Sequence, residues 1–76
     1  MLVGSELQAL RIIGDQAGKN TIWQVAAALG CSSDYARIIC RSLGTADYID
    51  LKPNGVCEIT AKGRQELDRS KARAKG

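Results

Sequence analysis

Two arginines carry the most informative chemistry in this chain of 76 residues. Arg37 and Arg41 are four residues apart in a segment with helical periodicity, so they would lie one turn apart on the same helix face. The guanidinium fork can donate two parallel hydrogen bonds to guanine O6 and N7, or it can clamp a phosphate. The alternative is that both arginines are simply solvated.

Catalysis finds little support in the sequence. There is no histidine, and no serine or cysteine has an evident base in the sequence. Cys31, Cys40 and Cys57 are separated by nine and seventeen residues, which fits neither a disulfide framework nor paired metal ligands. We expect all three to be reduced, small apolar residues of the core. The sequence therefore predicts a protein that is not an enzyme, with no metal and no cofactor.

The two arginines need a helix that other elements hold in place, and residues 21–49 predict one. Thr21 to Gln24 has the form of a capping box that starts a helix, and Gly30 ends this helix. Ser32 then caps a further helix of about residues 32–44. Its expected inward residues are Ala36, Ile39, Cys40 and Leu43, and its expected solvent-facing residues are Ser33, Asp34, Arg37, Ile38 and Arg41. This arrangement is typical of a helix-turn-helix, which normally delivers its second helix to the major groove of DNA.

A helix before this pair and a hairpin after it complete the predicted core. The first helix spans about residues 6–17, starting at a Ser5 to Gln8 capping box and stopping before Gly18. Apolar residues alternate along residues 48–60, which predicts two strands. A three-residue loop at Pro53 to Gly55 would place Leu51 opposite Cys57 and Ile49 opposite Ile59, whereas a two-residue loop would place Leu51 opposite Glu58. Only the longer loop gathers the apolar side chains on one face.

The positive charge of the chain is concentrated at its end. Thr60 is expected to cap a last helix, which should fray because no apolar stripe follows Leu67. Residues 1–68 form the predicted domain and carry seven basic and eight acidic side chains, a net charge of −1. Residues 69–76 form a basic, frayed or disordered tail with four positive charges. The tail charge would attract phosphates without sequence preference, or serve only solubility.

The order of elements resembles the winged helix-turn-helix domains of transcriptional regulators of the MarR and related types, an α+β, mostly helical fold with a three-helix core and a two-stranded wing. The resemblance covers about residues 5–68. It is carried by Thr21 to Ser32, by Ala36 to Ile49, and by Ile59-Thr60-x-x-Gly63-Arg64-x-x-Leu67. The last motif is the most specific, since it marks the step from the wing to the next helix.

This resemblance implies which residues would touch DNA. Positions that contact bases or phosphates in the family are occupied here by Ser33, Asp34, Tyr35, Arg37 and Arg41, and the tip of the wing by Lys52, Asn54 and Gly55. Asp34 has a second interpretation, because an acidic residue in the first turn stabilises a helix by itself. The implied function is sequence-specific binding of double-stranded DNA in transcription regulation.

Trp23 supports a different interpretation. Helical spacing places it with Ala27 on the outer side of its helix, where it would pack partly against the first helix or the end of the last one. Alternatively it contacts the DNA backbone or anchors a protein partner, with Ala27 and Ile38. The alternative function is thus a winged-helix interaction module in a larger assembly, without DNA binding of its own. The partner could also be a second copy of the chain, which would make a homodimer.

No membrane partner is expected. No apolar run approaches the roughly 18 residues of a membrane span, and the first residues lack the pattern of a signal peptide. The sequence predicts a cytoplasmic protein.

Overall fold

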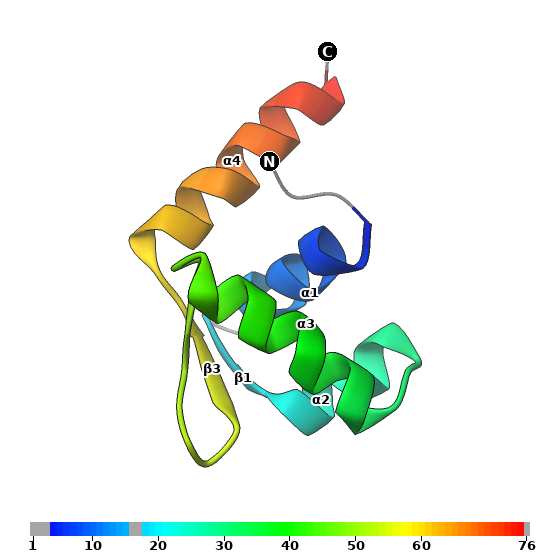
Figure 1. Cartoon of the computed structure of the whole chain (residues 1–76). Helices are drawn as coiled ribbons and strands as arrows, with labels where there is room; N and C mark the ends of the chain where they lie inside the picture. The colour runs from blue at the N-terminus through cyan, green and yellow to red at the C-terminus, as the bar shows by residue number, and fades with distance from the viewer. Residues whose placement is uncertain (1–3, 16–17, 76) are drawn as a thin grey trace.

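The structure, a computed structural model, describes residues 4–15 and 18–75, with only the backbone described for 71–75. The helices lie to one side of a small sheet, which makes the fold α+β and mostly helical, as predicted (Figure 1). The elements in chain order are α1 (Gly4–Asp15), β1 (Lys19–Thr21), α2 (Ile22–Leu29), α3 (Ser33–Thr45), β2 (Ile49–Leu51), β3 (Val56–Ile59) and α4 (Ala61–Lys75).

The predicted caps form the turn between α2 and α3. The Thr21 hydroxyl accepts from the backbone N–H of Gln24 at 3.2 Å, and the Gln24 side chain accepts from the Thr21 N–H at 3.0 Å. Gly30 ends α2 with a φ of 73°, a left-handed value that glycine adopts without strain. The Ser32 hydroxyl then caps α3 through the Tyr35 N–H at 3.2 Å. This confirms the helix-turn-helix.

Helix α1 begins earlier than expected. Its first residue is Gly4, so Ser5 lies inside the helix and not at its cap, a displacement typical of helix ends. The predicted end near residue 17 falls outside the described residues. Gly18 has a φ of 79°, in keeping with the left-handed stop that was predicted there.

The core lies between the three helices and one face of the sheet. The four α3 residues predicted to face inward, Ala36, Ile39, Cys40 and Leu43, are all buried. Ala9 of α1 is an additional core residue. The buried apolar residues are Ala9, Leu10, Ile13, Ile22, Val25, Ala26, Ala36, Ile39, Cys40, Leu43, Ile49, Cys57 and Leu67.

The hairpin has the register of the three-residue loop. Leu51 lies opposite Cys57 and Ile49 opposite Ile59, as predicted. The Gly55 N–H donates to the Lys52 carbonyl at 3.0 Å, and Gly55 has a φ of 90°. Glycine suits this position because it takes positive φ without a steric cost.

The sheet contains a strand that the sequence pattern did not predict. Residues Lys19–Thr21 form β1, which pairs antiparallel with β3, so the order is β1-β3-β2. Three residues are too few to show an alternating pattern, and this segment is set by its partner strand. Strand β1 leads directly into α2 and fixes where that helix starts.

Helix α4 begins at its predicted cap and extends beyond its predicted end. The Thr60 hydroxyl accepts from the Gly63 N–H at 3.1 Å. Helix α4 continues to Lys75, and its last turns project away from the core (Figure 1). The physical reason is local, because arginine, lysine and alanine favour helix and no proline or glycine interrupts residues 64–75. The frayed tail expected for residues 69–76 stays a prediction. Within the described residues, no helix has the length and apolar character needed to cross a membrane.

Candidate nucleic-acid interface

Helix α3 is held firmly on one side and open on the other. Its buried stripe packs on α1, α2 and β2, which fixes the rotation of the helix about its axis. Arg37 and Arg41 are consequently exposed on the opposite side. Among the residues that the structure describes, neither guanidinium has a hydrogen bond or an ion pair, so both retain their full donor capacity.

The two arginines face the hairpin across a hollow of about 600 Å³, here called the arginine hollow. Most of the residues predicted to touch DNA or a partner meet in it. They are Trp23, Arg37, Arg41, Lys52, Asn54 and Gly55. The wall formed by α3 supplies two positive charges, the hairpin forms the second wall, and the beginning of α2 closes one end.

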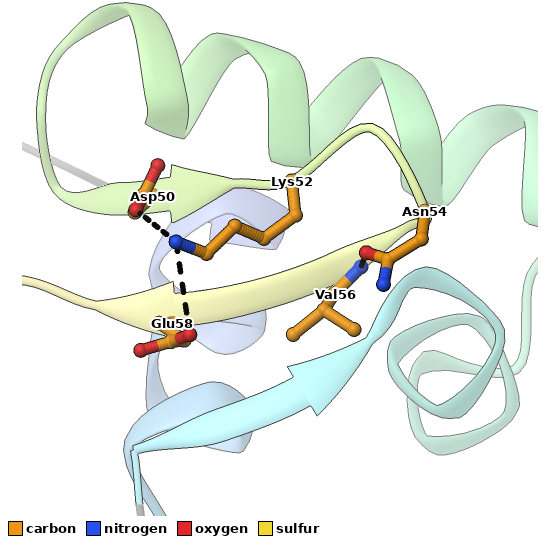
Figure 2. A network of polar contacts seen from close by, with 5 residues as sticks. All are labelled: Asp50, Lys52, Asn54, Val56 and Glu58. Carbon is orange, nitrogen blue, oxygen red and sulfur yellow. Dashed lines mark hydrogen bonds and ion pairs between the residues drawn. The ribbon is translucent and has the colours of Figure 1, made fainter.

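Lys52 is already engaged within the hairpin. Its Nζ lies 2.8 Å from Asp50 Oδ2 and 3.9 Å from Glu58 Oε1. Figure 2 shows the side chain running back from the turn toward these two carboxylates. The hydrogen bond and charge of Asp50, with the charge of Glu58, raise the pKa of Lys52 above its ordinary value. The charge of Lys52 is therefore partly neutralised by its ion pairs with Asp50 and Glu58, so Lys52 is less available to bind a phosphate.

Asn54 and Gly55 shape the turn. The Asn54 Oδ1 accepts from the Val56 N–H at 3.2 Å, which leaves its amide N–H₂ group without a partner among the described residues (Figure 2). The Gly55 carbonyl accepts from the Ile22 N–H at 2.9 Å and so ties the turn to the first residue of α2. The position of the hairpin tip is thus set by α2 as well as by its own strands.

Ser33, Asp34 and Tyr35 are not part of the arginine hollow. Ser33 is half-buried, whereas Asp34 is exposed in the first turn of α3, where a carboxylate favours the helix. Tyr35 lies on the side of α3 that faces α1, in a second hollow of about 390 Å³ that also contains Glu6 and Ile38. The side chains predicted along α3 therefore divide between two sides of the helix.

Solved structures share this architecture, although no protein-family model and no curated protein matches the chain. The reduced form of MarR from E. coli aligns with a TM-score of 0.80 and 16% identity, over 91% of this chain and 51% of that one. A proposed transcriptional regulator from Pseudomonas aeruginosa aligns with a TM-score of 0.76 and 25% identity, over 90% of this chain and 49% of that one. BpsR of Bordetella bronchiseptica aligns with a TM-score of 0.79 and 18% identity, over 97% of this chain and 56% of that one. The structure of BpsR concerns the regulation of its DNA binding by 6-hydroxynicotinic acid.

The chain has a MarR-like winged helix-turn-helix fold. It spans about half the length of these solved structures. In terms of this fold, α2 and α3 are the two helices of the helix-turn-helix, and the β2–β3 hairpin is the wing.

Trp23 lies at the wing and not where the simplest expectation placed it. The expected contacts were α1 or the end of α4, but the indole packs on Gly55 at the tip of the wing. A Cβ atom at Gly55 would lie 2.8 Å from Trp23 Cζ3, so a larger residue would displace the ring. The expectation failed because helical spacing gives the direction of a side chain but not which distant loop it meets.

The predicted partner surface is not continuous. Trp23 is 54% exposed in the arginine hollow, whereas Ile38 is 65% exposed in the Tyr35 hollow, and the two hollows share no residue. Ala27 is exposed on α2 and lines neither hollow. Trp23 and Ile38 thus belong to separate surfaces.

An acidic hollow that the sequence did not predict adjoins the arginine hollow. It has about 570 Å³, shares Arg41 and Leu51 with the arginine hollow, and contains Asp47 and Asp50. The sequence signal was available in part, since Asp50 precedes Lys52 on the same strand face. Asp47 comes near Arg41 because it lies in the turn that ends α3, where its N–H donates to the Gly44 carbonyl.

Two of the three cysteines, Cys40 and Cys57, are buried and in contact with each other. Contact with the thiol of Cys40, together with burial, raises the pKa of the Cys57 thiol. The same contact lowers the pKa of the Cys40 thiol. Among the described residues no group of three or more histidine, cysteine, aspartate or glutamate side chains could hold a metal ion.

Proposed function

We propose that this chain binds double-stranded DNA in transcription regulation, with α3 in the major groove and the wing beside the sugar-phosphate backbone. The observation that carries the proposal is the pair of exposed, unpaired guanidiniums of Arg37 and Arg41, which face the wing across the arginine hollow. Buried or paired arginines would be structural. Free arginines on the recognition helix match the chemistry of guanine and phosphate.

The net charge of residues 1–68 does not oppose this proposal, because binding depends on where the charges lie. The arginine hollow contains Arg37, Arg41 and Lys52 and no carboxylate. The acidic residues nearby lie in the adjoining hollow and on the outer side of the wing. A locally positive surface attracts phosphates even where the domain as a whole is slightly negative. A cytoplasmic location is part of the same proposal.

The matched variants for a test are Arg37→Ala with Arg41→Ala, compared with Arg11→Ala. Arg11 is an exposed arginine on α1 that donates to Ser70 Oγ at 3.3 Å, outside the arginine hollow. We expect the double variant to weaken binding of a mixed-sequence duplex by at least about tenfold, since each charge-assisted contact contributes about 1–3 kcal/mol. Arg11→Ala should bind almost as tightly as the wild type. Equal affinity for all three proteins would contradict the proposal.

The second candidate is a protein-interaction module, which the Tyr35 hollow favours. Tyr35 and Ile38 are 48% and 65% exposed beside this hollow, and large apolar side chains of this kind are typical of contact surfaces. A second copy of the chain is one partner that this surface could take. Sedimentation tests this candidate: a dimer lost on Ile38→Asp supports it, and a monomer at all concentrations contradicts the homodimer.

A further inference from the structure

Trp23 is a large apolar side chain whose exposure the core does not explain. The indole edge formed by Cζ3, Cη2 and Cε3 faces Gly55, and more than half of the residue remains accessible. The indole N–H has no hydrogen-bond acceptor among the described residues. The side chain therefore offers both an apolar face and a free donor to the arginine hollow.

The surroundings of Trp23 fit an anion with an apolar part. Arg37 and Arg41 supply free positive donors across the hollow, and Asn54 supplies a free amide N–H₂ group on the wing. All of these groups are donors, which suits phosphate oxygens. The exposed indole suits a sugar or another apolar surface next to them. A sugar-phosphate strand contains both kinds of group in alternation.

The charge distribution limits where such a strand could run. The arginine hollow and the acidic hollow are continuous through Arg41 and Leu51, but Asp47 and Asp50 line the second one. A phosphate strand running along the whole trough would meet these carboxylates at close range, which is unfavourable. A strand that crosses between α3 and the wing near Trp23 avoids them.

We propose that Trp23 is a DNA-contacting residue: its indole packs against a deoxyribose of the strand that crosses the arginine hollow, between phosphates held by Arg37 and Arg41. This inference rests on the proposed function. It agrees with the usual docking of a helix-turn-helix, in which the first helix of the motif crosses the backbone. Trp23 lies in the first turn of that helix. Its contact with Gly55 also positions the wing, so the same residue would join the two parts of the interface.

The test uses the full chain and the fluorescence of Trp23, which is the sole tryptophan. DNA binding is followed by the anisotropy of a labelled mixed-sequence duplex, and the accessibility of Trp23 by acrylamide quenching of its emission. We expect saturating duplex to protect Trp23 from acrylamide. We also expect Trp23→Ala to weaken binding by about tenfold, because it removes the apolar contact with the deoxyribose. Trp23→Phe, which keeps an aromatic face, should retain most of the affinity.

Ile12→Ala is the control for the loss of a partly exposed apolar side chain, because Ile12 lies on α1 outside the arginine hollow. Circular dichroism establishes that each variant is folded. If the duplex binds in an Arg37- and Arg41-dependent manner while acrylamide quenching and the affinity of Trp23→Ala are unchanged, the role of Trp23 is overturned and the proposed function stands. If the duplex does not bind at all, both fall.

Discussion

The hydroxyl of Thr60 joins three parts of the molecule. It donates to the Asp47 carbonyl, accepts from the Gly63 N–H at 3.1 Å, and so links the loop before β2 to the start of α4. Asp47 has a φ of 68°, a left-handed value uncommon for a residue other than glycine. One side chain thus caps a helix and restrains a strained position.

Two variants of Thr60 test the contribution of its hydroxyl separately from that of its side-chain volume. Thr60→Val removes both hydrogen bonds at nearly constant volume and should lower the free energy of unfolding by about 2 kcal/mol. Thr60→Ser keeps the hydroxyl and should cost much less. Urea denaturation measures both values, and equal losses for the two variants would contradict the role assigned to the hydroxyl.

The ion pair between Lys52 and Asp50 limits how well Lys52 can bind a phosphate. Asp50→Asn removes the carboxylate 2.8 Å from Nζ, so Lys52 should become available to phosphate and DNA affinity at low salt should rise. Asp15→Asn makes the same charge change at an exposed residue of α1 and is the control. Equal increases in the anisotropy-derived affinity for both variants would mean that only net charge matters.

At the scale of elements, the junction between the wing and α4 depends on Gly63. A Cβ atom at this position would lie 2.2 Å from the Tyr48 carbonyl oxygen and 2.7 Å from Ile59 Cγ1, so α4 could not approach the start of β2 as closely. This explains in physical terms why Ile59-Thr60-x-x-Gly63 was the most specific motif in the sequence. The glycine is required for its small size and not for positive φ.

A comparison of two helical glycines tests this explanation. Gly63→Ala should destabilise the protein by about 3 kcal/mol, because the methyl group would collide with backbone. Gly44→Ala places its Cβ no closer than 3.6 Å to another atom and should be neutral or stabilising by up to about 1 kcal/mol. Thermal unfolding measures the difference. Similar melting temperatures for the two variants would contradict the close approach at Gly63.

The elements that sequence reasoning predicted are those with local signals. Capping residues, and apolar residues repeating every three or four positions, predicted α2 and α3. The alternation of apolar residues, which requires Leu51 opposite Cys57, predicted the hairpin register. Strand β1 was missed because three residues carry no period and are ordered only by β3. The contact of Trp23 with Gly55 was also missed, because the two residues are far apart in the sequence and only the tertiary structure brings them together.

At the scale of the whole molecule, the charges are arranged in separate regions. The arginine hollow is positive, the adjoining hollow contains two aspartates, and the basic residues of 69–75 lie on the projecting part of α4. The total charge of +3 describes none of these regions. The sequence assigned the predicted DNA-contacting residues to α3 and the wing, but it did not show that those on α3 lie on two sides of the helix.

The most direct test of the central claim is the salt dependence of duplex binding by the wild type and by the Arg37→Ala, Arg41→Ala double variant. Each phosphate contact changes the slope of log affinity against log salt concentration by about 0.9. If both arginines contact phosphates, the slope of the double variant should be shallower by about 2; if they read bases instead, its affinity should fall uniformly at every salt concentration. Wild-type binding with neither change in the double variant would contradict the account.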